Sequence, residues 1–276
     1  MSAPSTVPAH RAVYDDARTY AVAFSYRDVE SELAFLLRVG ERYGGRPVAS
    51  LLELACGPAF HAVAAAQRGL RATALDLSEA MVRLVQQRAA SHGVTVEALA
   101  ANMADFVLPA PVDLAFNLMT SISYLISTAE LHAHFASVAR ALRPGGVYVI
   151  ENNHPNDFWT RSHFQPSSWT QSDGELEVRM SWISEPPEID VVNQTYTITT
   201  RTEIGPARRD GVVPADGPRR ELTDRAVLRM IWPQELKALA EAHGFSLAAF
   251  FGELSESMPI DAPEAWRTVA VLVRDR

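Results

Sequence analysis

The sequence has little of what stabilises secreted proteins or anchors membrane proteins. Its single cysteine, Cys56, excludes a disulfide within the chain. No apolar run approaches the ~20 residues that a membrane span requires, and the N-terminus lacks the basic and then apolar segments of a secretory signal. These absences favour a protein of the reducing cytoplasm that does not associate with membranes.

Positive charge is also scarce. Lysine and arginine together number 25 against 33 aspartates and glutamates, which gives a net charge of -8. A broad electrostatic surface for nucleic acid is therefore not expected. The remaining composition, 47% apolar and 21% charged residues over 276 positions, indicates a globular protein with one large domain or one domain and an insertion.

Short apolar runs alternate with helical patterns between residues 46 and 154. The runs VASLLELA, RATALDLS, VTVEALAANM, VDLAFNLM and VYVIENN read as strands, and Ala-rich or amphipathic segments separate them. Ser78 and Thr128 are placed as N-caps of two of these helices. Strands that alternate with helices of this length predict a parallel sheet with crossover helices.

The pattern differs on both sides of this core. Residues 1–45 predict an N-terminal helical segment, and residues 155–232 show period-2 alternation without helices, which indicates an inserted antiparallel sheet. Residues 233–276 return to a helix, with Pro233 in its first turn, followed by two strands. We therefore expect four segments, of which the first and third are additions to an α/β core.

The stretch LLELACGPAFHA joins the first predicted strand to its helix. Small residues at Ala55, Gly57 and Ala59 allow a ligand to approach the backbone, and the helix N-terminus offers free N–H groups. Asp76 ends the next strand, 19 residues beyond Gly57, where a carboxylate can accept from a ribose diol. A nucleoside site is predicted; the alternatives are a tight turn and a helix-capping aspartate. Phe60 stands where a dinucleotide fingerprint needs glycine, which disfavours NAD.

The same loop resembles motif I of class I S-adenosylmethionine-dependent methyltransferases, E/D-x-G/A-x-G-x-G/A. Glu53, Ala55, Gly57 and Ala59 match it position by position, and ALDLSEAMV, ANMADF, FNLMTSISYL and ALRPGGVYVIE resemble the later motifs in order. The resemblance covers about residues 46–152 strongly and the last 45 residues more weakly. It implies a Rossmann-like α/β fold with a seven-stranded, mostly parallel sheet whose last strand is antiparallel. The insertion would then be an antiparallel β cap over the acceptor site.

The resemblance also implies a cofactor, S-adenosylmethionine, with S-adenosylhomocysteine as product. Asp76 would hold the ribose, Asn102 and Met103 the adenine, and Asn117 and Leu118 the region of the sulfonium. The N-terminal segment resembles that of glycine and amino-sugar N-methyltransferases, in which an arginine grips the methionine carboxylate and a lid excludes water. The implied cofactor-binding residues are Tyr14, Tyr20, Tyr26, Arg27, Glu53, Ala55, Gly57, Pro58, Asp76, Leu77, Asn102, Met103, Asn117 and Leu118.

Two residues after the fifth predicted strand are candidates for a general base. His154 and Glu151 lie in VIENNHP, at the carboxyl edge of the sheet. The alternative is that His154 caps a turn before Pro155 and that Glu151 binds backbone. His132 and His134 are two positions apart on a helix and point away from each other, so no metal site is expected.

The sequence thus predicts an S-adenosylmethionine-dependent methyltransferase that N- or O-methylates a small-molecule acceptor. A protein that binds the cofactor without turnover, as a regulator or scaffold, is an alternative, and so is a peptide or protein methyltransferase. The sequence leaves the oligomeric state open, and a homodimer is compatible with it.

Overall fold

The computed structural model describes residues 12–159, 166–207 and 219–275. The chain divides into two compact units, and each of them is built from two separate stretches of sequence. The first unit comprises Met1–Arg27 with Phe164–Leu228, and the second comprises Asp28–His163 with Arg229–Arg276.

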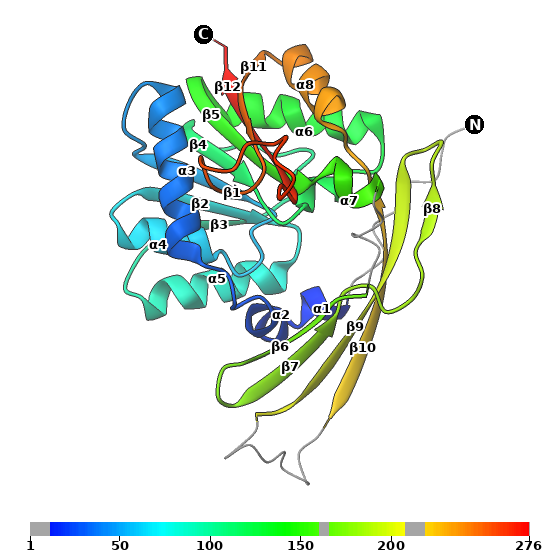
Figure 1. The fold of residues 1–276 in the computed structure, drawn as a ribbon. Coiled ribbons are helices and arrows are strands. Elements are labelled where there is room, and N and C mark those ends of the chain that lie inside the picture. Colours follow the sequence, from blue (N-terminus) through cyan, green and yellow to red (C-terminus); the bar gives the residue numbers. More distant parts are fainter. Residues whose placement is uncertain (1–11, 160–165, 208–218, 276) are drawn as a thin grey trace, which may run out of the picture. The chain divides into compact units, whose positions relative to one another are not determined.

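The larger unit contains the predicted seven-stranded sheet, in the order β11-β12-β5-β4-β1-β2-β3 (Figure 1). Neighbouring strands from β5 to β3 are parallel, whereas β12 runs antiparallel to both β5 and β11. The prediction of one antiparallel strand, the last in the chain, is confirmed. The strands are β1 (Ser50–Leu54), β2 (Arg71–Asp76), β3 (Val96–Ala100), β4 (Val112–Asn117), β5 (Leu142–Asn153), β11 (Phe245–Phe251) and β12 (Arg267–Arg274).

Helices cover both faces of this sheet. One apolar core joins α3 (Val29–Gly44), α4 (Phe60–Gln67) and α5 (Glu79–Ser91) to it, and a second core joins α6 (Thr128–Ala141) and α8 (Pro233–Ala242) to the other face. Two shorter helices, η1 (Ser121–Tyr124) and α7 (Pro155–Trp159), follow β4 and β5. Since both faces are covered, the central strands β1 and β4 are buried along their length, which is why they read as apolar runs in the sequence.

Two helix starts follow the local sequence signals. Ser78 caps α5 by accepting from the Met81 N–H, and Pro233 occupies the first turn of α8. Helix α6 differs from the prediction, because its N-cap is Ser127 instead of Thr128. Ser127 forms a capping box with Glu130, which satisfies two N–H donors, whereas Thr128 lies inside the helix.

The predicted N-terminal segment 1–45 does not form one piece. Helix α3 belongs to the larger unit, because Leu33, Phe35, Leu36 and Val39 are fully buried in its core. The preceding residues belong to the smaller unit. The amphipathic pattern of α3 shows that the helix is packed on one side, and only the structure shows which unit it packs against.

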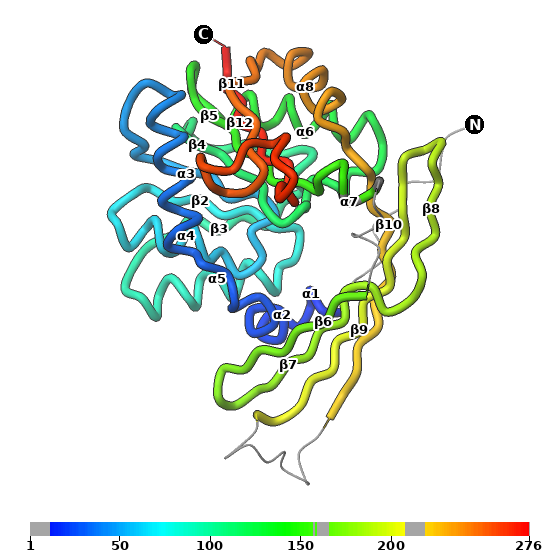
Figure 2. Tube along the Cα trace, in the orientation of Figure 1, coloured from blue at the N-terminus to red at the C-terminus, as the bar shows by residue number. Residues whose placement is uncertain are grey.

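The smaller unit combines the N-terminal helices with an antiparallel sheet. Helices α1 (Ala12–Asp15) and α2 (Ala17–Ala23) accompany a sheet of order β10-β9-β7-β6, in which β8 also pairs with β9. Figure 2 shows α2 beside β6 and β7, and α2 contacts both strands. The strands are β6 (Ser168–Ser172), β7 (Leu176–Ser181), β8 (Glu188–Asp190), β9 (Thr195–Pro206) and β10 (Arg220–Arg229).

Among the described residues, no helix has both the length and the apolar character to cross a membrane.

Candidate functional site

The loop between β1 and α4 has a backbone that few sequences adopt. Ala55, Gly57 and Ala59 all have φ of 50°, in the left-handed region, although only one of them is glycine. Alternation of left-handed and ordinary residues turns successive N–H groups toward a common concavity, which suits an anion or a ligand backbone. Strain of this kind concentrates at functional sites. The small residues of this stretch therefore serve backbone geometry as well as ligand access.

Asp76 fastens this loop to the end of β2. Its Oδ2 accepts from the Gly57 N–H at 2.8 Å, and its Oδ1 accepts from the Ser78 N–H at 2.9 Å. Burial raises the pKa of Asp76 above its ordinary value, although the backbone hydrogen bonds oppose this shift. A carboxylate has about four acceptor sites, so beyond the Gly57, Ser78 and Leu77 N–H groups the residue keeps acceptor capacity for a further donor. Ribose hydroxyls are donors of that kind.

The turn after β3 carries the residues expected at the adenine. Asn102 is exposed, and its Oδ1 accepts from the Ala104 N–H at 2.9 Å, so part of its hydrogen-bonding capacity holds the turn. Met103 is half-buried, and its carbonyl bonds the buried His134 at 2.8 Å. Leu77, after β2, is 61% exposed, which is unusual for leucine and leaves an apolar surface available to a flat ring.

His134 supports this turn, and the sequence pattern does not reveal that role. It is fully buried in α6, and its two ring nitrogens bond the Met103 carbonyl and the Tyr148 hydroxyl. Burial lowers the pKa of His134 to about 4, so it is neutral at physiological pH. A neutral imidazole donates through one nitrogen only, so Nδ1 donates to Met103 and the tyrosine hydroxyl donates to Nε2.

Asn117 ends β4 beside β1 and has an incomplete set of partners. Its amide nitrogen donates to the Leu54 carbonyl at 3.2 Å, but its Oδ1 is buried without a hydrogen-bond partner. Leaving a buried acceptor unsatisfied costs about 1–3 kcal/mol, so an amide oxygen in this state usually has a use. Leu118, the next residue, is buried. A ligand ammonium group would satisfy Asn117, and S-adenosylmethionine carries one.

Glu53, the acidic residue of the loop motif, faces the protein interior. Its Oε2 accepts from the Ala62 N–H at 2.7 Å in the first turn of α4, and its Oε1 lies 3.3 Å from His61 Nδ1. The other ring nitrogen of His61 lies 2.6 Å from Glu32 of α3. Burial by itself would lower the pKa of His61, but hydrogen bonds to Glu32 and Glu53 raise it to about 9. His61 is therefore an imidazolium that ties α3 and β1 to the start of α4.

This buried cation predicts a pH-dependent stability. The folded pKa of about 9 exceeds the ordinary 6.5, so the stabilisation is complete below pH 6.5 and is lost as the pH rises through 9. We expect the free energy of unfolding to fall by an amount on the order of 3 kcal/mol across this window. Urea unfolding at pH 6.5, 8 and 9.5 measures it. In His61→Gln, which cannot bind the proton, the decline should be absent; an equal decline in both proteins would contradict the assignment.

The end of β5 does not present a free base. His154 is buried, its Nδ1 accepts from the Asn156 N–H at 3.2 Å, and its Nε2 lies 2.9 Å from the Ile260 carbonyl. Since Nδ1 accepts, Nε2 carries the proton and donates, and neither nitrogen is available to a substrate. The structure therefore supports the alternative interpretation, in which His154 caps the turn that begins α7. The proximity of His154 to the strand end suggested a base; the partners of both ring nitrogens oppose it.

Glu151 is likewise engaged with the protein. Its Oε2 accepts from the Met119 N–H at 2.9 Å, its Oε1 lies 3.3 Å from Arg267 Nε, and it is 3% exposed. Both carboxylate oxygens are thus engaged by protein groups, and this geometry disfavours Glu151 as the catalytic base. It binds backbone, as the alternative interpretation held, and the arginine that pairs with it was not identified from the sequence.

The N-terminal aromatic residues pack together within the smaller unit. Tyr14 and Tyr20 have ring centroids 5.2 Å apart, Tyr26 lies 5.9 Å from Trp169, and Phe24 contacts Tyr20, Tyr26 and Trp169. The Trp169 indole N–H donates to the Ala23 carbonyl at 2.7 Å. The packing interpretation of these tyrosines thus applies within their unit. Tyr26 is still 50% exposed and Arg27 is half-buried, so their predicted contact with the cofactor stays a prediction.

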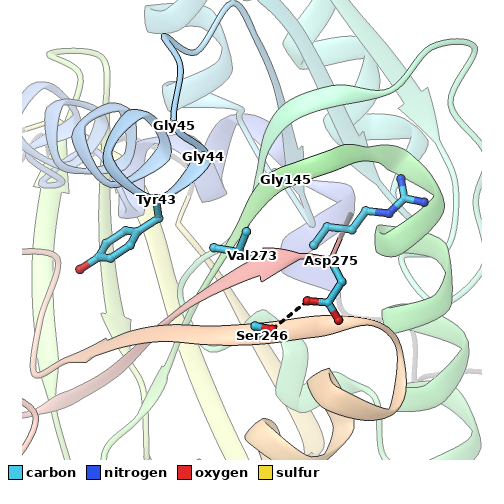
Figure 3. Close-up of a pocket in the computed structure, with 8 residues that line it drawn as sticks. Tyr43, Gly44, Gly45, Gly145, Ser246, Val273 and Asp275 are labelled. Carbon is cyan, nitrogen blue, oxygen red and sulfur yellow. Dashed lines mark hydrogen bonds between the residues drawn. The ribbon is translucent and has the colours of Figure 1, made fainter.

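Cys56 adds no reactive group to the larger unit. Cys56 is buried, and burial raises the pKa of its thiol well above the ordinary value, so it is not a nucleophile. Within the described part of the chain, no three His, Cys, Asp or Glu residues are grouped to hold a metal ion. A shallow hollow lies beside Tyr43, Gly145 and the Ser246–Asp275 hydrogen bond (Figure 3). Gly145 and Ser246 lie near the starts of β5 and β11, and Asp275 follows the end of β12, so the hollow lies at the edge of the sheet opposite the loop.

Comparison with known proteins supports the resemblance over the core. Residues 51–146 match the family model described as a methyltransferase domain. The chain is 31% identical over 144 residues to the malonyl-[acyl-carrier protein] O-methyltransferase of Serratia marcescens, over 51% of this chain and 52% of that protein. It is 34% identical over 102 residues, 37% of this chain and 41% of that one, to a dTDP-3-amino-3,4,6-trideoxy-alpha-D-glucopyranose N,N-dimethyltransferase of Streptomyces venezuelae. The chain spans about half the length of these curated relatives.

Solved structures extend the likeness to nearly the whole chain. An S-adenosylmethionine-dependent methyltransferase from Clostridium acetobutylicum has a TM-score of 0.73 at 13% identity, with 96% of this chain and 100% of that one covered. DesVI of Streptomyces venezuelae has a TM-score of 0.73 at 21% identity, with 94% and 97% covered. A sugar N-methyltransferase from Streptoalloteichus sp. has a TM-score of 0.70 at 22% identity, with 100% and 99% covered. At these identities the likeness establishes the fold.

Proposed function

We propose that this chain, whose residues 51–146 match the methyltransferase-domain model, is an S-adenosylmethionine-dependent methyltransferase that acts on a small-molecule acceptor. The observation that carries the proposal is the left-handed loop at Ala55, Gly57 and Ala59, fastened by Asp76. That geometry turns N–H groups outward beside a carboxylate that retains acceptor capacity, which suits a nucleoside. The relatives bear methyltransferase names, and the loop explains physically how this chain would hold the same cofactor.

Different residues of the larger unit would bind different parts of the cofactor. Asp76 would accept from the ribose hydroxyls, and the exposed Leu77 and half-buried Met103 would contact the adenine faces. The unsatisfied Oδ1 of Asn117 would accept from the ammonium of the methionine portion. Bound S-adenosylmethionine supplies a methyl group on a positively charged sulfur, a leaving group that needs no further activation. The chain then has to align the acceptor and exclude water.

We further propose that the accepting atom is a nitrogen. An alcohol must lose its proton to become a good nucleophile, whereas the neutral form of an amine carries a free lone pair. Both candidate bases at the end of β5 are engaged by protein groups, which favours an acceptor that needs no base. The name of one relative specifies N,N-dimethylation of an amino sugar and that of one structural neighbour N-methylation of a sugar, which supports polar small amines as the first acceptors to test.

Asp76→Ala tests the cofactor site. We expect it to weaken S-adenosylhomocysteine binding by about 1.5–3 kcal/mol, the range for hydrogen bonds to a charged group. Isothermal titration calorimetry measures the loss. Glu79→Ala is the matched control, because it removes an exposed carboxylate at the start of the next helix that forms an exposed ion pair with Arg83. If folded Asp76→Ala binds as tightly as the wild type, the assignment of Asp76 is wrong.

Turnover distinguishes an enzyme from a binding protein. Incubation with S-adenosylmethionine and a panel of small amines and matched alcohols should release S-adenosylhomocysteine with amines only. Release with alcohols alone would contradict the nitrogen acceptor. Cofactor binding without release for any acceptor class, including peptides, would favour a regulatory or scaffold role.

His154→Ala tests whether a base is needed. We expect kcat at saturating cofactor to stay within about tenfold of the wild type, because the imidazole is engaged with backbone, whereas removal of a general base costs about 10²–10⁴-fold. Thermal unfolding should show a loss of about 1–2 kcal/mol for the missing hydrogen bonds. A rate loss above 100-fold that shrinks at high pH, with stability unchanged, would restore His154 as the base.

A further inference from the structure

The turn after β4 is strained and lies at the proposed site. Met119 and Thr120 follow the two residues that the resemblance places near the sulfonium, and their φ angles are 58° and 60°. Two consecutive non-glycine residues in the left-handed region are costly, and they persist only where the surroundings hold them. The chain must therefore contain groups that hold this turn.

Glu151 holds both residues of the turn from β5. Its side-chain Oε2 accepts from the Met119 N–H at 2.9 Å, and its backbone carbonyl accepts from the Thr120 N–H at 3.2 Å. Both N–H groups are thus directed at one residue of the neighbouring strand. Because the side chain of Glu151 is almost fully buried, its negative charge requires a cation close by.

Arg267, the first residue of β12, supplies that cation. Its Nε lies 3.3 Å from Glu151 Oε1, an ion pair without the alignment of a good hydrogen bond. Its Nη1 donates to Asn153 Oδ1 at 2.9 Å. The antiparallel register of β12 and β5 sets Arg267 directly opposite Asn153, and the guanidinium lies 4.3 Å from the centre of the Trp266 ring. Contacts with three residues, Glu151, Asn153 and Trp266, therefore fix the guanidinium.

The contacts form a closed ring. Thr120 Oγ1 bonds the same Asn153 Oδ1 at 3.2 Å, so the turn is joined to Arg267 through Asn153 as well as through Glu151. We propose that Glu151 and Arg267 are positioning residues of the methyl-transfer site, which hold the strained turn after β4 in its working conformation. This inference rests on the proposed function. It gives the carboxylate a role without proton transfer, and it adds an arginine from a strand more than 110 residues away.

The test uses Glu151→Gln, Arg267→Met, the double variant and the milder Arg267→Lys. Arg38→Met is the control, because it removes an arginine from an exposed ion pair in the same unit.

A displacement of about 1 Å in an active site can cost 100-fold in rate. We expect the first two variants to lose about 10- to 100-fold in kcat, with affinity for S-adenosylhomocysteine within threefold of the wild type. The double variant should lose no more than the worse single variant, since the ring is one unit. Arg267→Lys should recover part of the loss.

Two readouts distinguish positioning from other roles. The pH profile of kcat should keep its shape in Glu151→Gln; a loss that shrinks at high pH would make Glu151 a base and overturn the proposal. Hydrogen exchange of the 117–124 segment should accelerate in the ring variants and not in the control, a result independent of turnover. Unchanged exchange together with unchanged kcat would also overturn it. If the wild type neither binds S-adenosylhomocysteine nor methylates, the proposed function fails first, and accelerated exchange would then show only that the ring holds the turn.

Discussion

Replacing Gly57 by valine is expected to abolish cofactor binding in a protein that still folds. Gly57 has φ of 50°, where a β-branched residue is strongly disfavoured, at a cost of about 1–2 kcal/mol. Relief of that strain would turn the Gly57 N–H away from Asp76, with which it forms a 2.8 Å hydrogen bond. The loop and the ribose carboxylate would be disturbed together. We expect the Kd for S-adenosylhomocysteine to rise at least 100-fold, about 2.8 kcal/mol.

Calorimetric titration measures the affinity for S-adenosylhomocysteine, and circular dichroism shows whether the variant is folded. Ala55→Gly is the matched control, because it changes a residue of the same loop with the same φ of 50° toward the residue type that prefers it. It should bind at least as well as the wild type, with stability changed by less than about 1 kcal/mol. If Gly57→Val keeps wild-type affinity, the loop is not the cofactor site, whatever happens to Ala55→Gly.

Replacing Asp113 by alanine is expected to have the opposite effect, a large loss of stability with binding retained. Asp113 is 6% exposed near the start of β4, at the sheet edge opposite the loop. Its carboxylate accepts from Arg46 and Arg143, both at 2.6 Å, and from the Ser50 hydroxyl at 2.9 Å. Burial alone would raise the pKa of Asp113, but these bonds and the Ala49 N–H hold it well below the usual range.

Removing one partner of a buried charge network costs about 3–5 kcal/mol, because Arg143 and the strand amides lose their acceptor. We expect Asp113→Ala to lose about that much in urea unfolding at pH 7. Asp113→Asn is the control, since it keeps an acceptor oxygen but no charge, and it should lose roughly half as much. Both should bind S-adenosylhomocysteine normally at low temperature. A loss below about 1 kcal/mol for the alanine variant would show that the network contributes little.

The sequence by itself determined the α/β core and the position of its ligand loop. Strands buried on both faces appear as apolar runs, helices keep a 3.6-residue period, and caps such as Ser78 are local signals. The ligand loop and Asp76 could be identified because Asp76 follows Gly57 by 19 residues, close to the spacing expected between such a loop and a ribose-binding carboxylate. These are properties of neighbouring residues, so a linear pattern retains them.

The tertiary structure alone decided the protonation and partners of the polar residues. His61 is a cation because Glu32, on another helix, meets its far nitrogen, whereas His134 is neutral because burial outweighs its one carbonyl partner. His154 is engaged because the Ile260 carbonyl, 106 residues later, reaches its Nε2. These contacts join residues that are far apart in the sequence, so no local sequence pattern indicates them.

The sequence likewise does not show which residues contact the N-terminal aromatic side chains or Glu151. The aromatic pattern of residues 14–26 indicates packing, but only the fold shows that it joins Trp169, more than 140 residues onward. Glu151 has the position of a base in the sequence, and the antiparallel return of β12 places Arg267 against it. Charge states depend on which elements pack together, because the energy of a buried ion is set by its nearest partners and not by its neighbours in the chain.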